Sequence, residues 1–245
     1  MDSSNLDPNS VVQVDRAMLR QLVVKLLQRK GMFVAEAEIV AERMMEADLL
    51  QRSGEGVGSL PEYLNAMDLG DIDPRARIIT VTETPAIAVL EGSTGMGHVA
   101  TTKAMLMAAE KANAVGTGTV QIRNSRPCGD LGGLVRLAAN QGLIGVVTTS
   151  LDPGANATPG HHDLAWAIPA PDGAAPLIQR VRSGSLDGGI SILCGVLSAG
   201  LAGADAIPHK RKAAHAANSV EYSLVAISPD KFGVRDTFFA KWKAL

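Results

Sequence analysis

Three adjacent polar residues, His161, His162 and Asp163, point more directly to chemistry than any other run in this sequence. Imidazole and carboxylate groups can ligate a metal ion or pass a proton near neutral pH. Neighbouring residues of an extended segment point in opposite directions, however, so three such side chains rarely converge on one ion. We therefore expect acid or base roles and no metal site, with a capping cluster or an exposed turn as the alternative.

Cys128 follows Pro127 and precedes Gly129 at the predicted start of a helix. A helix N-terminus and an adjacent arginine, here Arg126, lower the pKa of a thiol and favour the nucleophilic thiolate. A small buried residue at a tight turn is the simpler interpretation and the one we favour. Cys128 is retained as a candidate contact for a substrate.

The run Gly95-Met96-Gly97-His98-Val99-Ala100 follows a predicted strand and opens a predicted helix, so it matches a dinucleotide-binding fingerprint. The next strand ends in Arg123 and Asn124, where that fingerprint requires an acidic residue for the ribose hydroxyls. A lone match of this kind is weak, and the interpretation that the glycines serve only the turn is favoured.

Periodicity and capping residues predict the elements that must position these groups. Asp15 is a suitable N-cap for an amphipathic helix that ends at Gly31. Further helices are predicted over 34–50, 60–69, 98–115, 131–140, 190–204 and 235–243, and strands over 77–83, 86–90, 119–123, 143–149, 165–168 and 222–227. The rest of 151–189 is expected to be irregular, because it carries five prolines and six glycines. A helical N-terminal layer (1–75) and an α/β core (76–245) follow, which can form a single compact unit.

Composition excludes several classes of partner. The formal charge is −2 with acids and bases interspersed, so no electrostatic footprint for nucleic acid is expected. Two cysteines, Cys128 and Cys194, cannot build a disulfide framework, and their spacing is not that of a zinc site. The first ten residues lack the apolar run of a signal peptide, and no apolar stretch is long enough to predict a membrane span. We expect a cytoplasmic protein.

Several short blocks in consistent order resemble one family. They are Ala47-Asp48-Leu49, Gly56-Val57, Leu60-Pro61-Glu62-Tyr63-Leu64, Gly70-Asp71-Ile72-Asp73-Pro74, Gly95-Met96-Gly97, Glu110-Lys111-Ala112, Val120-Gln121-Ile122-Arg123-Asn124-Ser125 and Gly142-Leu143-Ile144-Gly145. This pattern is similar to the malate/L-lactate dehydrogenase-like oxidoreductases. The resemblance implies an α/β, non-Rossmann fold with a helical N-terminal layer and a mixed sheet flanked by helices. It also implies a homodimer that reduces 2-oxo acids or cyclic imino acids with NAD(P)H.

The family's working residues are replaced in this chain. Glu55 stands where the resemblance places a proton-donor histidine, Leu50 where it places a substrate-binding arginine, and Pro127 where it places a second histidine. The segment from 172 to 189 is a short bridge in place of a long block that the family uses for its cofactor. Loss of the arginine removes a contact worth about 1.5–3 kcal/mol. Loss of the proton donor forfeits roughly 10²- to 10⁴-fold in rate.

From these replacements we expect that NAD(P)H-dependent reduction is lost, and that the cleft performs cofactor-independent acid/base chemistry on a small oxo- or amino-acid-like molecule. Two alternatives stay open: an oxidoreductase that uses NAD or NADP in an unusual site, and a catalytically silent relative that binds a ligand or a partner. The candidate catalytic residues are Glu55, His161, His162 and Asp163. The candidate substrate-binding residues are Arg52, Asn124, Ser125, Arg126 and Cys128.

Overall fold

A computed structural model describes residues 13–151, 162–171, 174–182, 194, 197 and 219–242. In this part of the chain a mixed sheet of seven strands has the order β1-β2-β3-β7-β4-β5-β6. Its strands are β1 (Ile79–Glu83), β2 (Ile87–Glu91), β3 (Thr117–Ser125), β4 (Ile144–Leu151), β5 (Leu164–Ile168), β6 (Leu177–Val181) and β7 (Val220–Ile227). The pair β2 and β3 is parallel, and the other neighbours are antiparallel.

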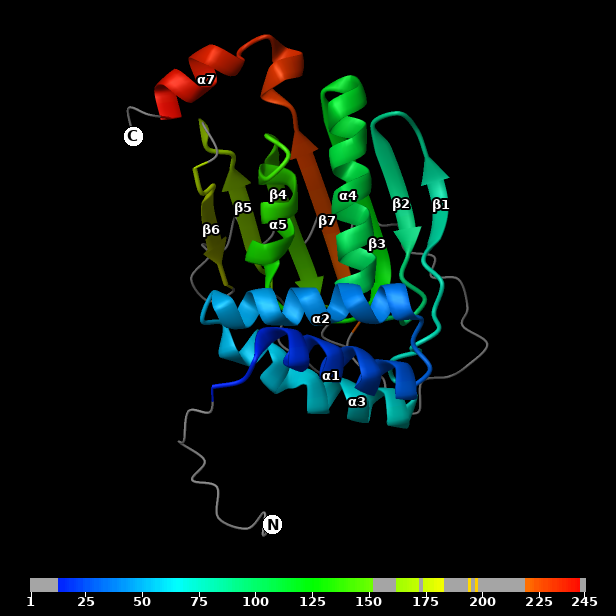
Figure 1. The fold of residues 1–245 in the computed structure, drawn as a ribbon. Coiled ribbons are helices and arrows are strands. Elements are labelled where there is room, and N and C mark those ends of the chain that lie inside the picture. The colour runs from blue at the N-terminus through cyan, green and yellow to red at the C-terminus, as the bar shows by residue number, and fades with distance from the viewer. Residues whose placement is uncertain are drawn as a thin grey trace.

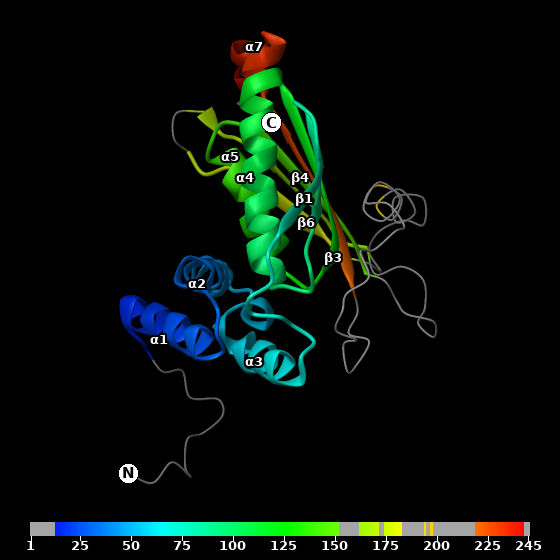
Figure 2. The same ribbon diagram turned by 90° about the vertical axis from the view of Figure 1, so that its right-hand side faces the viewer.

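The helices form two groups around this sheet. They are α1 (Arg16–Arg29), α2 (Val34–Leu49), α3 (Leu60–Leu69), α4 (Gly97–Val115), α5 (Leu131–Ala139) and α7 (Arg235–Trp242), with short 3-10 turns η1 (Ser53–Glu55), η2 (Val57–Ser59) and η5 (Pro229–Phe232). Figure 1 shows α1, α2 and α3 lying across the end of the sheet at which β3 and β4 finish. Figure 2 shows α4 and α5 together on one face of the sheet. Every helix in the described ranges is too short or too polar to cross a membrane.

The helix boundaries follow from single residues that satisfy or interrupt backbone hydrogen bonding. The Asp15 carboxylate accepts a hydrogen bond from the Met18 amide and caps the start of α1. Gly70 ends α3 with φ 81°, and Gly116 ends α4 with φ 102°. Glycine adopts this left-handed conformation without the steric penalty that a Cβ imposes, so both helices stop at these positions.

The predicted α/β class and the order of elements are confirmed, with one correction and one gap. Residues 172–189 were predicted to be an irregular bridge, but β6 lies within this range and pairs with β5 from Leu164↔Val181 to Ile168↔Leu177. Its backbone amides and carbonyls bond to a neighbouring strand, which outweighs the flanking glycines and prolines. Most of the predicted helix over 190–204 lies outside the described residues, although Cys194 within it is described and buried.

Two hydrophobic clusters stabilise the fold, and the first turns of α4 join them. One fills the space between the sheet and α4 and α5, and the other lies within the helical layer. Met96 and Val99 belong to the layer's cluster, whereas Ala100 belongs to the cluster against the sheet. His98 lies between these residues, is 1% exposed, and places its ring edge-to-face against Tyr63 with centroids 5.1 Å apart.

The glycines before α4 serve close backbone packing. A Cβ on Gly97 would lie 1.9 Å from the carbonyl oxygen of Arg126 and 2.5 Å from that of Pro127. The 126–127 backbone therefore packs directly against Gly97 and leaves no room for a side chain there. The match to a dinucleotide fingerprint at residues 95–100 reflects this turn.

His98 predicts a specific dependence of stability on pH. Burial, reinforced by the nearby Arg43 charge, lowers the pKa of His98 from 6.5 to about 3. Below pH 6.5 the unfolded chain binds a proton that the folded chain refuses, so stability falls as the pH decreases toward about 3. The limiting slope is about 1.4 kcal/mol per pH unit. His98→Leu removes this slope, so its stability relative to wild type, measured by urea unfolding, rises as the pH is lowered. Parallel pH profiles for the two proteins would contradict the assignment.

Candidate functional site

Strand β6 directs an arginine side chain toward the helical layer. Alternate residues of a strand share a face, so Arg180 points to the same side as Ile178. Ile178 packs against the cluster that lies between the sheet and the helices α4 and α5. Arg180 is consequently carried to the N-terminal end of α5, where its side chain is only 9% exposed.

Three carboxylates from three different elements surround the Arg180 guanidinium. Glu55 of η1 accepts a hydrogen bond from Nη1 at 2.5 Å. Asp130, which also caps α5 through the Gly133 amide, accepts from Nη1 at 3.2 Å. Asp163, which precedes β5, accepts from Nη2 at 3.2 Å. Arg180 therefore joins the helical layer, the start of α5 and the connection into β5.

The charges in this group, which we name the Arg180 cluster (Glu55, Asp130, Asp163, Arg180 and Arg182), support one another. Burial alone would lower the pKa of Arg180, but hydrogen bonds and charge attraction from Glu55 and Asp163 outweigh it and raise that pKa. Arg182 donates from Nη2 to the other oxygen of Glu55 at 2.9 Å. Its side chain is 62% exposed, so it reaches solvent while Arg180 does not.

A cleft of about 520 Å³ opens beside the Arg180 cluster. The cluster supplies Glu55, Asp163, Arg180 and Arg182 to its lining, and the remaining lining residues are Gly54, Tyr63, Pro127, Cys128, Gly129, Leu131, Thr149, Val220 and Tyr222. This volume lies within the range of small-molecule sites. A wall of apolar and aromatic side chains thus faces a charged rim, which is the usual composition of a site that binds a small polar molecule.

Two side chains of the cleft are held in their protonated forms. Burial raises the pKa of the Cys128 thiol to about 12, against weaker opposing hydrogen bonds with Tyr222 and Thr101. Burial also raises the pKa of Tyr63, and the nearby Cys128 and Glu55 act in the same direction. Near neutral pH both groups are therefore hydrogen-bond donors, and Cys128 is not a nucleophilic thiolate.

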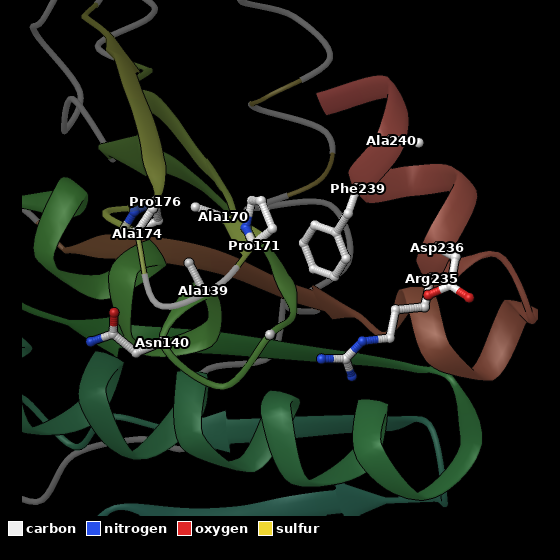
Figure 3. A pocket seen from close by; sticks show the side chains of 11 residues that line it. Ala139, Asn140, Ala170, Pro171, Ala174, Pro176, Arg235, Asp236, Phe239 and Ala240 are labelled. Carbon is white, nitrogen blue, oxygen red and sulfur yellow. The ribbon is translucent and has the colours of Figure 1, made fainter. Parts of the chain in front are cut away.

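A second hollow, of about 700 Å³, lies at the other end of β6 between α5 and α7. Figure 3 shows Phe239 of α7 turned toward Pro171, with Arg235 below it. Arg235 is already paired with Asp230 at 2.7 Å and lies over the Phe239 ring. This hollow is larger but contains no grouping of several acids and bases, so the cleft at the Arg180 cluster is the stronger candidate site.

Three of the residues predicted from sequence meet in the cleft. Glu55 and Asp163 come together on Arg180, and Cys128 lies in the wall beside them. His162 is half-buried and its Nδ1 lies 3.3 Å from the carbonyl oxygen of Thr149, outside the cleft lining. His161 lies outside the described residues. Within the described ranges no group of three or more acidic, histidine or cysteine side chains could hold a metal ion.

The other predicted binding residues lie outside the lining of the cleft. Asn124, at φ 53°, donates from Nδ2 to Glu91 at 3.2 Å. Ser125 is fully buried. Arg126 is 5% exposed and donates from Nε to the carbonyl oxygen of Asp71 at 2.7 Å, so its guanidinium fastens the helical layer to the sheet. Arg52 is exposed and lines an adjoining hollow of about 370 Å³ together with Leu50.

Sequence reasoning missed Asp130, Arg180 and Arg182. Asp130 carries the signal of an N-cap, a short acidic residue directly before an apolar helix, and that signal could have located it. Arg180 lies 125 residues from Glu55 and 50 from Asp130 along the chain, so no local pattern links them. The segment Leu177-Ile178-Gln179-Arg180-Val181 also lacks the apolar and polar alternation that predicts a strand.

We expect the Arg180 cluster to respond unequally to the loss of its two arginines. Arg180→Met leaves three carboxylates facing one another in a buried site, and stability measured by urea unfolding falls by about 3–5 kcal/mol. The control Arg182→Gln removes an exposed pair and changes stability by at most about 1 kcal/mol. Equal losses in the two variants would mean that Arg180 does not hold the cluster together.

The chain is similar to known proteins of one family. The sequence pattern of the malate/L-lactate dehydrogenase family matches residues 14–179. An L-sulfolactate dehydrogenase from Methanocaldococcus jannaschii is 38% identical over 134 residues, which cover 55% of this chain and 39% of the relative. A malate dehydrogenase from Pyrococcus abyssi is 36% identical over 142 residues, which cover 58% and 39%. The matches thus span about two fifths of the length of these curated relatives.

Solved structures agree on the fold. The malate dehydrogenase of Pyrococcus horikoshii superimposes with a TM-score of 0.81 at 22% identity, covering 99% of this chain and 83% of that one. The sulfolactate dehydrogenase of Methanocaldococcus jannaschii superimposes with a TM-score of 0.79 at 25% identity, covering 92% and 80%. The predicted fold, a helical layer against a mixed sheet flanked by helices, is confirmed.

These relatives correct the expectation of cofactor-independent acid/base chemistry. That expectation rested on missing side chains, but the relatives are dehydrogenases, and dehydrogenation needs a two-electron carrier that no ordinary side chain supplies. The expectation that no cofactor is used is wrong for the same reason. The family's sequence pattern matches more than half of the residues, and the fold is the same. The chain therefore belongs to the malate/L-lactate dehydrogenase family.

Proposed function

We propose that the chain is an NAD(P)-dependent oxidoreductase that interconverts a small 2-oxo acid and its 2-hydroxy acid in the cleft beside the Arg180 cluster. The observation that carries the proposal is the cleft itself, which joins an apolar wall to a solvent-facing guanidinium within a fold shared with dehydrogenases. A small acid requires a cation for its carboxylate and an apolar surface for its carbon chain.

The cleft residues fit both a small acid and the reactive end of a nicotinamide cofactor. A volume of about 520 Å³ accommodates an aromatic ring together with a short carbon chain. Leu131, Val220 and the aromatic ring of Tyr63 supply apolar contacts, and Arg182 offers exposed N–H donors to a carboxylate or a phosphate. When bound, the nicotinamide supplies the hydride for the substrate carbonyl carbon.

Tyr63 is the residue that we propose as the source of the proton for the carbonyl oxygen. The position of the family's proton-donor histidine holds Glu55, whose carboxylate is committed to Arg180 and Arg182. Tyr63 lines the cleft, and its phenol is protonated near neutral pH, since its ordinary pKa of 10.0 is raised further by burial. Its phenol can donate a hydrogen bond to the carbonyl oxygen and transfer the proton as negative charge develops there.

The test is consumption of NADH or NADPH by the purified protein with a panel of 2-oxo acids and cyclic imino acids, supported by calorimetric binding of each cofactor. We expect turnover with at least one acid. Tyr63→Phe should lower kcat by about 10²- to 10⁴-fold while cofactor binding persists.

Tyr222→Phe is the matched control, because the chain has two tyrosines and each variant removes one hydroxyl. The Tyr222 hydroxyl donates to the Arg126 carbonyl oxygen at 3.0 Å, so its loss should reduce stability and spare kcat. Absence of cofactor binding and of turnover across the whole panel would reject the proposed function. Turnover that survives Tyr63→Phe would reject the proton donor alone.

We further propose that the chain is a cytoplasmic homodimer in which residues 1–75 and 76–245 fold as one unit. The shared packing of Met96, Val99 and Ala100 at the start of α4 supports the single unit. The edge strand β1 exposes all of its side chains, including Ile79 and Val81, and such an apolar edge is normally covered by a partner. Light scattering in solution measures the molar mass and so tests whether the chain is a dimer.

A further inference from the structure

The substrate anion must find a cation other than the one that the family resemblance provides. Leu50 occupies the position of the substrate-binding arginine and lines the hollow that adjoins the cleft. Among the described residues that line the cleft, the cationic side chains are Arg180 and Arg182. The choice of substrate therefore depends on what these two guanidinium groups can still bind.

Arg180 is committed to the protein. Its guanidinium bonds to Glu55, Asp130 and Asp163, and its side chain is 9% exposed. Drawing it away from these partners would leave several carboxylates without their cation in a largely buried site, which is strongly unfavourable. Arg180 is consequently a structural cation and a poor anchor for an exchangeable anion.

Arg182 has the opposite character. Among the described residues one ion pair holds it, from Nη2 to Oε1 of Glu55, and its side chain is 62% exposed. A guanidinium has five N–H donors, so an incoming carboxylate can bind it in a two-pronged geometry. Glu55 retains its bond to Arg180 through Oε2 when Oε1 is released. Exchange of one carboxylate for another at Arg182 therefore leaves Arg182 paired with the substrate and Glu55 still bonded to Arg180.

The charge of the Arg180 cluster limits the substrate to one negative group. Three carboxylates and two guanidinium groups leave the cluster with one net negative charge. A single substrate carboxylate brings its own attraction to Arg182, but a second acid group would meet no further cation in the described lining and would be repelled by the carboxylates. Leu131 and Val220 instead offer apolar contact at the remainder of the wall.

We propose that Arg182 is the carboxylate anchor of this cleft, that Glu55 occupies it in the empty state, and that the cleft selects monoanionic 2-oxo acids with short apolar side chains over dianionic acids. The proposal rests on the proposed oxidoreductase function. It separates this chain from relatives named for malate and sulfolactate, which each carry two acidic groups.

The kinetic test compares 2-oxobutyrate with oxaloacetate in the NAD(P)H-dependent reaction. We expect kcat/KM to favour 2-oxobutyrate by at least about tenfold, the factor that one missing charge-assisted contact confers. Arg182→Gln should raise KM for 2-oxobutyrate by about tenfold or more with little change in kcat, since it removes binding and not proton transfer. Glu55→Gln removes the competing charge, so it should lower KM and reduce the discrimination against oxaloacetate.

Arg235→Gln is the matched control, because Arg235 is 61% exposed, has one ion pair with Asp230, and lies at the other end of β6. It should leave both KM values unchanged. A preference for oxaloacetate, or a KM that Arg182→Gln does not alter, would overturn the proposal while reduction itself continues.

A binding measurement tests the role of Arg182 as carboxylate anchor independently of turnover. Calorimetry with oxamate, a monoanion, and tartronate, a dianion, should give tighter binding of oxamate to wild type and loss of that binding in Arg182→Gln. If no acid is reduced and oxamate still binds through Arg182, the proposed function fails and the anchor stands. If oxamate binds wild type and Arg182→Gln equally, the anchor is wrong.

Discussion

The arrangement of the cleft depends on the burial of one guanidinium among three carboxylates. Glu55, Asp130 and Asp163 come from η1, the N-cap of α5 and the residue before β5. Arg180, near the end of β6, donates hydrogen bonds to all three carboxylates. A carboxylate group removed from water needs such a partner, so this one side chain fixes where the helical layer meets the sheet at the cleft.

The burial of Arg180 also distinguishes an arginine that stabilises the fold from an arginine that can bind a ligand. Arg180 is buried and bonds to three carboxylates, whereas Arg182, two residues further along, has a single ion pair among the described residues and reaches solvent. The site thereby presents a cation directly after strand β6, and not at the end of α2, where the family resemblance places the substrate arginine. Protonated Tyr63 and Cys128 complete the wall with hydrogen-bond donors and no additional charge. The dehydrogenase fold is kept while the polar contacts come from other elements.

Local signals in the sequence predicted most of the elements, because each depended on a few neighbouring residues. Asp15 marked the start of α1, and Gly31 marked its end. The strand β6 was missed because glycines and prolines on both sides masked a five-residue strand. Because this strand was not predicted, Arg180 and Arg182 were not recognised as candidate site residues.

The candidate site was only partly predictable for a related reason. Glu55 and Asp163 were recognised as polar residues in unusual places, but their common partner lies far away in sequence. Arg126 was predicted to bind substrate because of its neighbours in the sequence. In the structure its guanidinium instead donates a hydrogen bond to the Asp71 carbonyl oxygen. The two histidines that the family resemblance places in the site are indeed absent from this chain. The inference that reduction is therefore lost was wrong, because other protonated side chains can face the same cleft.

The most direct test of the account is transfer of deuterium from nicotinamide-deuterated NADH to 2-oxobutyrate, followed by mass spectrometry of the 2-hydroxybutyrate formed. We expect one carbon-bound deuterium in each product molecule. Arg182→Gln should slow product formation at low substrate concentration without changing the labelled fraction. Product that carries no deuterium, or no product from either reduced cofactor, would contradict the central claim that this cleft performs hydride transfer to a small acid.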